Sequence, residues 1–208
     1  MINFEQLLEL ARIPAVRFHS MQQVLSHYMP LINNSECLCY VGANTGQEIP
    51  MCRMYAKHIY AFEGMRDLSV WHPLQEHEDQ QVTCLNYVLC DREDIIPMWP
   101  ANNNLESSSI SPPQTHLSEF AHVQFGMPIQ VQAKRLDQFS FAPMVDVIIM
   151  DVQGAELQVL QGVSEWNQMK MIILEYMRDK MYTASCTFDQ IYDNWIRRAS
   201  LGIDHMDS

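Results

Sequence analysis

Residues 37 to 49 read CLCYVGANTGQEI, and the rest of the chain is arranged around this stretch. A short apolar run predicts a strand, a glycine-containing turn comes after it, and a helix is expected to begin near Gln47. Gly42 and Gly46 have no side chain, so the backbone of this turn can approach a ligand closely. The helix N-terminus after the turn offers unpaired N–H groups. Turns of this kind also simply end strands, so the prediction of a ligand site depends on the second strand.

A second predicted strand, residues 58 to 63 (HIYAFE), ends in Glu63. In nucleotide-binding α/β folds an acidic residue about 20 residues after the glycine turn accepts hydrogen bonds from ribose hydroxyls. The full Gly-x-Gly-x-x-Gly pattern of dinucleotide sites is absent. Gly42 and Gly46 alone provide fewer amides for a pyrophosphate, so an adenosine ligand without phosphates fits better than NAD. The candidate that these residues favour is S-adenosylmethionine.

Length and composition indicate one soluble domain with a full hydrophobic core. The chain has 208 residues, of which 48% are hydrophobic and 18% charged, and this is the balance of a globular domain. The formal charge of −12 disfavours a nucleic-acid backbone or an anionic membrane as the main partner. No apolar run reaches the length of a membrane span, and the N-terminus lacks the order of a signal peptide. We therefore expect a cytoplasmic protein.

The six cysteines show no metal-binding spacing. None of them forms a Cys-x-x-Cys pair, and no His-x-x-x-His pattern completes a zinc site. Cys37, Cys39, Cys84 and Cys90 fall in predicted strands, so they are expected to be core thiols in a reducing cytosol. The sequence predicts no bound metal.

The hydrophobic pattern alternates strands and helices in the order of a parallel α/β sheet. Helices over residues 3 to 12 and from Ser20 onward predict a helical lead-in, residues 1 to 35, ahead of one globular domain, residues 36 to 208. The crossovers between the strands are long enough for parallel pairing. After the first strand, we expect strands at 58–63, 82–91, 129–139, 145–152 and 170–177, and helices at 47–57, at 67–79 with a kink near Pro73, from Glu156, and from Thr187.

Residues 92 to 128 interrupt this alternation with the run NNNLESSSISPPQ. The segment leaves the carboxyl edge of the sheet, where open α/β sheets bind ligands. A loop of this length is usually either functional or disordered, and both a substrate lid and a floppy insertion stay open. His116 and His122 lie in it and are candidate general bases near neutral pH, although a solvated loop histidine is the more common case.

The second informative stretch is VDVIIMDVQGAELQVLQG, residues 145 to 162. Its apolar run predicts a central parallel strand covered on both faces. Asp151 ends that strand and Glu175 ends the next one, so both carboxylates are expected at the ligand-binding edge. Asp151 is a candidate base or acceptor-orienting group, or alternatively a cap of the turn at Gly154. The pair could instead chelate a divalent cation, but no clear third ligand is present, and a purely structural Glu175 is an equal alternative.

Together these motifs resemble the FkbM-type S-adenosylmethionine-dependent methyltransferases. The resemblance rests on VGANTG, AFE, NNNLESSS and MDVQGAELQVLQG in this order, and it runs from about residue 37 to about residue 202. It implies an α/β, Rossmann-like class I methyltransferase fold with a mostly parallel sheet of order 3-2-1-4-5 and helices on both faces. It also implies S-adenosylmethionine as cofactor and O-methylation of a hydroxyl on a sugar or small metabolite.

The resemblance assigns roles to individual positions. Gly42, Asn44 and Gly46 would line the methionine end of the cofactor, with Tyr40 and Ala43 in the same turn. Glu63 would hold the ribose hydroxyls. Asp151 and Glu175 would be the catalytic carboxylates beside the sulfonium and the acceptor, with Glu156 bracing their loop. Asn86 and Asp91 would lie near the adenine.

Three departures from the family pattern bear on activity. Tyr40 stands where the family usually has an acidic residue that helps to hold the methionine group, and Ile149 stands where a lysine is frequent. The C-terminal end looks too short for the usual closing strands, and a homo-oligomer or the lead-in helices could cover the exposed edge. These departures favour the alternative of a degenerate, non-catalytic relative that binds partners. A dinucleotide enzyme is disfavoured by the incomplete glycine pattern.

Overall fold

The computed structural model describes residues 21–32, 34–114, 118, 120–164, 166–175, 181–186 and 190–191. The predicted helix at 3–12, His116 and the C-terminal end lie outside the described residues, and of the helix expected from Thr187 only residues 190 and 191 are described, both helical. None of the helices within these ranges is long and apolar enough to cross a membrane.

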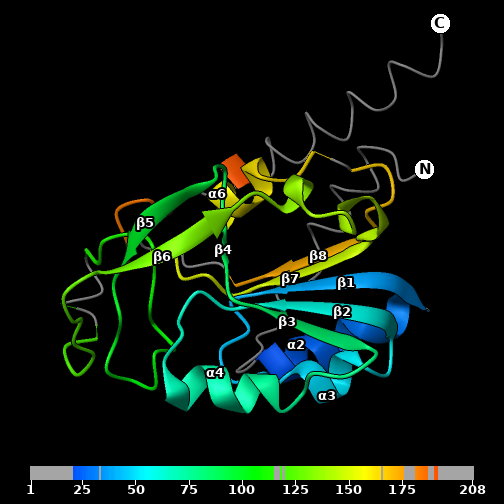
Figure 1. Cartoon of the computed structure of the whole chain (residues 1–208), viewed down its shortest axis with the longest axis horizontal. Coiled ribbons are helices and arrows are strands. Elements are labelled where there is room, and N and C mark those ends of the chain that lie inside the picture. The colour runs from blue at the N-terminus through cyan, green and yellow to red at the C-terminus, as the bar shows by residue number, and fades with distance from the viewer. Residues whose placement is uncertain are drawn as a thin grey trace, which may run out of the picture.

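A five-stranded sheet in the order β3-β2-β1-β7-β8 forms the centre of the molecule (Figure 1). Each neighbouring pair in it is parallel. Because β7 and β8 are the fourth and fifth strands of this sheet in the chain, the predicted order 3-2-1-4-5 is confirmed. The strands are β1 (Ser35–Val41), β2 (Ala56–Phe62), β3 (Val82–Leu85), β7 (Val147–Met150) and β8 (Met171–Leu174).

Helices cover both faces of this sheet (Figure 1). Alternate residues of a strand point to opposite faces, so Leu38 and Tyr40 of β1 pack with one helical layer and Cys39 and Val41 with the other. The first layer holds α2 (Met21–Tyr28), the 3₁₀ turn η1 (Met29–Leu31), α3 (Ile49–Cys52) and α4 (Leu68–Gln75), and the second is built on α6 (Glu156–Gln161) with η2 (Leu136–Gln138) and η3 (Ala142–Met144).

The structure differs from the prediction in the strands that follow β2. The strand expected at 82–91 is two strands, because the chain turns at Asn86, whose Nδ2 donates to the main-chain oxygens of Glu63 (2.9 Å) and Gly64 (3.2 Å). The second strand joins a small separate sheet of order β4-β6-β5. This sheet contains β4 (Val88–Leu89), β5 (Asp94–Met98) and β6 (Ile129–Lys134). β5 lies in the stretch expected to lack strands; it contains Pro97, a residue that sheets tolerate at an edge.

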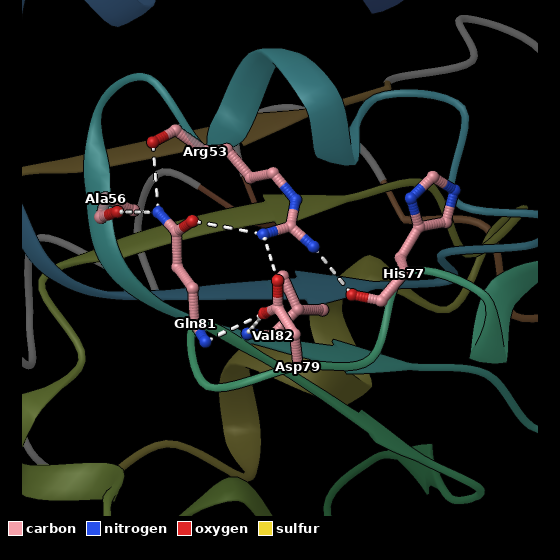
Figure 2. A network of polar contacts seen from close by, with 6 residues as sticks. All are labelled: Arg53, Ala56, His77, Asp79, Gln81 and Val82. Carbon is pink, nitrogen blue, oxygen red and sulfur yellow. Dashed lines mark hydrogen bonds and ion pairs between the residues drawn. The ribbon is translucent and has the colours of Figure 1, made fainter.

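The helix expected at 47–57 is also shorter than predicted. α3 ends at Cys52, and a polar network centred on Arg53 fixes the chain as it leaves the helix (Figure 2). The Arg53 guanidinium donates to Asp79 Oδ2 (2.8 Å) and to the main-chain oxygen of His77 (2.7 Å). Gln81 Nε2 donates back to the main-chain oxygens of Arg53 (3.0 Å) and Ala56 (2.7 Å). The network ties the amino ends of β2 and β3 to α3.

The amino end of β7 is held by a second set of polar contacts. The buried Asp146 accepts hydrogen bonds from Ser35 Oγ (2.5 Å) and from the main-chain N–H groups of Glu36 (2.9 Å) and Cys37 (3.3 Å). Lys170 Nζ forms an ion pair with it at 2.7 Å. These contacts join β1, β7 and β8 at the edge opposite to the one where open α/β sheets bind ligands. All six cysteines are buried free thiols.

Candidate active site

A cavity of about 510 Å³ lies at the carboxyl edge of the five-stranded sheet. The strand order reverses between β1 and β7, and such a switch point is where open α/β sheets hold ligands. The volume falls in the range of roughly 300–1,000 Å³ that suits ligands of cofactor size. Among the residues predicted for the site, those lining the cavity are Tyr40, Gly42, Ala43, Asn44, Glu63, Asp151 and Glu175.

The glycine turn packs directly against the end of β7. A Cβ atom on Gly42 would lie 2.0 Å from the main-chain oxygen of Asp151, and its φ of +75° favours glycine. The N–H groups of Gly42 and Ala43 donate to the Phe62 oxygen at 3.0 and 2.9 Å, which anchors the turn on β2. Gly46, also at positive φ, packs against side chains of α3 and α4 and does not line the cavity.

Glu63 is a buried carboxylate at the end of β2, only 6% exposed. Its Oε1 accepts from the Met65 N–H at 2.7 Å and its Oε2 from the Asn44 N–H at 3.0 Å. Burial raises its pKa, and these amide donors oppose that shift. The Gly64 amide also acts on this carboxylate. A carboxylate can accept about four hydrogen bonds, so Glu63 keeps capacity to accept from a ligand hydroxyl.

Tyr40 brings a further carboxylate to the cavity. The side chain is 3% exposed, and its hydroxyl donates to Glu48 Oε2 at 2.6 Å. Burial, followed by the charge of Glu48, raises the pKa of Tyr40 well above its ordinary value, so it stays a hydrogen-bond donor. Glu48 precedes α3 and also lines the cavity. Position 40 has no acidic residue, but the tyrosine at this position holds the Glu48 carboxylate at the cavity.

Asp151 and Glu175 are joined by one side chain. Gln153 Nε2 donates to Asp151 Oδ1 at 2.6 Å and to Glu175 Oε2 at 2.8 Å. Burial, and next the charge of Glu175, raise the pKa of Asp151 well above its ordinary value. Glu156 braces the turn as expected, since its Oε1 accepts from the Gly154 N–H at 3.0 Å. The sheet thus brings the two predicted catalytic carboxylates together at the ends of adjacent strands.

The insertion contributes a wall of the cavity. The Tyr182 hydroxyl donates to the main-chain oxygen of Ser107 at 2.8 Å, and Ser109 Oγ donates to the main-chain oxygen of Gln153 at 2.7 Å. His122 lies on the cavity, whereas the position of His116 is not described. The described part of the insertion is hydrogen-bonded to the strand ends, which supports the functional alternative. It lines the cavity with Asn103, Leu105, Glu106, Ser107, Ser108, Ser109, Ile110, Phe120, His122 and Val123.

Two further predicted residues lie off the cavity. Asn86 fixes the exit of β3 through the main chain of Glu63 and Gly64. The Asp91 carboxylate pairs with Arg92 Nε at 2.9 Å, beyond the end of β4. Their proposed proximity to an adenine stays a prediction.

Three residues at the site were not singled out from the sequence: Glu48, Gln153 and Tyr182. Gln153 stands between Asp151 and Gly154 in a stretch already recognised, so its position was a usable signal. Glu48 stands in the stretch 37–49, eight residues after Tyr40, so its position was also a usable signal, whereas Tyr182 reaches the site through a contact between distant segments that no local pattern encodes. Within the described chain, no three His, Cys, Asp or Glu residues gather in a way that could hold a metal ion.

Comparison with known proteins identifies the family of the chain. Residues 41–200 match the model of the methyltransferase FkbM domain. The 2-O-methyltransferase NoeI of Sinorhizobium fredii (strain NBRC 101917 / NGR234) is 34% identical over a region covering 50% of this chain and 47% of that protein, so the chain spans about half the length of this relative. A solved structure, the YcgJ protein from Bacillus subtilis, aligns over 85% of this chain and 67% of its own, with a TM-score of 0.43 and 10% identity. The chain belongs to the FkbM-domain methyltransferases.

Proposed function

We propose that this chain transfers a methyl group from S-adenosylmethionine to a hydroxyl of a sugar or another small polyhydroxy compound. The observation that carries the proposal is the placement of Glu63 and the Asp151–Glu175 pair on either side of one glycine turn, around one cavity. Membership of the FkbM family supports methyl transfer. The name of NoeI, a 2-O-methyltransferase, supports a hydroxyl as the acceptor.

The residues present fit the cofactor. The remaining acceptor capacity of Glu63 suits a ribose hydroxyl of the adenosine, and the tight turn at Gly42 lets the ligand approach the backbone. Glu48, held by Tyr40, suits the ammonium of the methionine part. The bound cofactor would supply a methyl group on a sulfonium, which is already a strong electrophile. The protein then has to align the acceptor oxygen and accept its proton.

The charge of the cavity favours an acceptor without negative charge. The lining includes five carboxyl groups, of Glu48, Glu63, Glu106, Asp151 and Glu175, and no lysine or arginine among the described residues. They attract the positively charged cofactor and repel phosphates or carboxylates, since like charges close together are unfavourable. We therefore propose neutral glycosides as the acceptor class, rather than nucleotide-activated or phosphorylated sugars.

The alternative of a non-catalytic relative rests in part on Tyr40 and Ile149. Tyr40 carries Glu48 to the cavity, so the substitution at position 40 does not leave the site without a carboxylate. Ile149 is fully buried in the core beneath α2, α3 and α4 and does not line the cavity. Neither residue, in these surroundings, favours loss of function.

Calorimetric titration with S-adenosylmethionine and S-adenosylhomocysteine tests the cofactor assignment. Micromolar binding, about 8 kcal/mol, is expected for the wild type. Glu63→Gln should weaken it by about tenfold or more, because an amide in place of the carboxylate turns an N–H toward the Met65 or Asn44 donor. Glu76→Gln, at an exposed position after α4, is the matched control and should bind normally. A folded wild type that binds neither ligand would overturn the proposal.

A methyl-transfer screen then tests the acceptor class. Methyl glycosides and the corresponding sugar phosphates are compared with radiolabelled S-adenosylmethionine. Transfer to neutral glycosides but not to the phosphates is expected. Preferential transfer to the phosphates would contradict the charge argument while leaving the cofactor assignment intact.

A further inference from the structure

Gln153 has more side-chain contacts than a turn residue requires. Its Nε2 donates to Asp151 Oδ1 (2.6 Å) and Glu175 Oε2 (2.8 Å), and its Oε1 lies 3.2 Å from the hydroxyl oxygen of Tyr182, which has one hydrogen for this acceptor and the nearer main-chain oxygen of Ser107. The side chain is 8% exposed and the Tyr182 side chain is fully buried. One amide group therefore links the ends of β7 and β8 to the segment at 181–186.

The two carboxylates determine which way this amide faces. An ionised carboxylate only accepts hydrogen bonds, whereas the amide nitrogen has two hydrogens to donate. In the reverse orientation the amide oxygen would face both carboxylates, which is unfavourable. The orientation with Nε2 between the two carboxyl groups is thus set by the negative charge that the pair carries.

The backbone conformation of Gln153 is a second, independent indication that this position requires a glutamine side chain. Its φ of 53° is in the left-handed region, where glycine or asparagine fits with less strain. Ser109 Oγ holds its main-chain oxygen at 2.7 Å. Strained residues of this kind cluster at functional sites. An asparagine would relieve the strain, but its amide is one methylene shorter and would not reach both carboxylates from the same backbone position.

We propose that Gln153 is a positioning residue that holds Asp151 and Glu175 as one pair sharing a single proton, with the proton on Asp151 and the charge on Glu175. The inference rests on the proposed function for its catalytic consequence, though not for the pairing itself. Asp151 is the half-buried member, and Glu175 is exposed on the cavity side. Burial favours the neutral form of a carboxyl, so the exposed Glu175 is the ionised partner that an acceptor reaches.

Other titratable groups around the pair act in the same direction. Glu156 of α6 lies close enough to raise the pKa of Asp151, after burial and Glu175. Tyr40 and Tyr182 flank the pair, and burial raises the pKa of each hydroxyl, so both stay neutral donors. Glu156 therefore adds negative charge beside the pair, which favours retention of one proton, and the two neutral tyrosines bring no positive charge to oppose it.

The proton balance of methyl transfer depends on this arrangement. As the acceptor oxygen forms its bond to the methyl carbon, the carbon–sulfur bond breaks and its electron pair neutralises the sulfonium. The hydroxyl proton passes to the ionised Glu175. The pair then holds two protons and returns one to solvent before the next turnover. Gln153 keeps Glu175 in place through both states, because its second N–H stays bound to the Asp151 side.

Carbon-13 NMR of the full chain, labelled at the Asp and Glu side-chain carboxyls, tests the pairing without an acceptor. Asp151→Asn and Glu175→Gln assign the two signals. In the wild type both signals should follow two shared titration steps separated by more than about one pH unit. In Gln153→Leu both steps should move to higher pH, because each ionised carboxyl loses an N–H donor. Gln130→Leu, on an exposed position of β6, should titrate like the wild type.

Two results of this titration would overturn the pairing. One is that Asp151 and Glu175 titrate in the wild type as independent single steps. The other is that Gln153→Leu leaves their titration unchanged. If Gln153→Leu does not fold, the isosteric Gln153→Glu replaces it. A third carboxyl at the same point should then raise the upper step, and an unchanged upper step would also overturn the proposal.

Kinetics with a methyl glycoside identified in the screen test the catalytic consequence. Gln153→Leu should bind S-adenosylhomocysteine nearly as well as the wild type, while kcat falls about tenfold or more and its pH dependence moves to higher pH. A loss in cofactor affinity with an unchanged pH dependence of kcat would show that Gln153 is only structural. If the wild type binds no S-adenosylhomocysteine, the proposed function fails, whereas the NMR titration still decides the pairing.

Discussion

Two aspartates bracket the strand β7 and differ in their surroundings. Burial opposes ionisation of Asp146, but the donors Lys170 and Ser35 and two main-chain amides outweigh it and lower its pKa. At the other end, burial and the charge of Glu175 raise the pKa of Asp151. The same residue type on one strand is thus stabilised as an anion at the amino end and destabilised as an anion at the carboxyl end.

Asp151→Asn should make the protein more stable at neutral pH. The folded wild type retains a proton on Asp151 that the unfolded chain releases, so its stability falls as pH rises from the unfolded pKa through the raised folded pKa. The variant lacks this fall in stability, so its free energy of unfolding at neutral pH should be higher by on the order of 1 kcal/mol. Urea unfolding between mildly acidic and neutral pH measures it. A less stable variant at neutral pH would contradict the assigned direction.

Asp146→Asn should show the opposite behaviour. The lowered folded pKa gives a contribution that is present above the unfolded pKa and is lost as pH falls through the folded value. The variant should lose about 2 kcal/mol at neutral pH, since the new amide turns N–H groups toward existing donors. The difference from wild type should shrink in acid. Asp94→Asn, at an exposed position, is the control in the same unfolding experiment.

At the scale of elements, the Arg53 network makes a testable connection between α3, β2 and β3 (Figure 2). Arg53→Leu should lower the midpoint of thermal unfolding by on the order of a few degrees, because the His77 carbonyl and Asp79 lose their donor. S-adenosylhomocysteine binding should stay unchanged, because Arg53 does not line the cavity. A large loss of binding in a folded variant would contradict this expectation, and would show that the contacts at the amino ends of β2 and β3 affect the cavity at the opposite edge of the sheet.

The elements also show what the sequence could predict. β1 and β7 are identifiable because each is an apolar run before a glycine turn, and the sheet order is predictable from their alternation with helices. The break between β3 and β4 depends on hydrogen bonds from Asn86 to the end of β2, and β5 contains Pro97. Glu63, Asp151 and Glu175 stand out as strand-end carboxylates. Glu48 lies in the glycine-turn stretch itself, whereas Tyr182 acts through contacts between distant segments, which a local pattern does not contain.

At the scale of the whole molecule, negative charge and the cavity act together. The chain carries a formal charge of −12, and five acidic side chains, of which Asp151 is proposed to hold a proton, line the site. S-adenosylmethionine carries the sulfonium charge that S-adenosylhomocysteine lacks. Raising the ionic strength from about 0.1 M to about 1 M shortens the screening length from about 10 Å to about 3 Å. Calorimetry should therefore show a larger loss of affinity for S-adenosylmethionine, and equal losses would contradict the electrostatic account.

The seam between the insertion and the segment at 181–186 bears on how acceptor preference can be re-engineered or diversified. Main-chain N–H groups of Gln114 and Thr183 donate across it, at 2.8 and 2.9 Å, and Ser111 Oγ accepts from the Ala184 N–H at 2.7 Å. Two segments that are distant in the sequence thus form one structural unit. If only the insertion were replaced by that of a relative, its hydrogen bonds to the segment at 181–186 would no longer match. If both segments were exchanged together, the cavity would gain a new wall while the five-stranded sheet stayed unchanged.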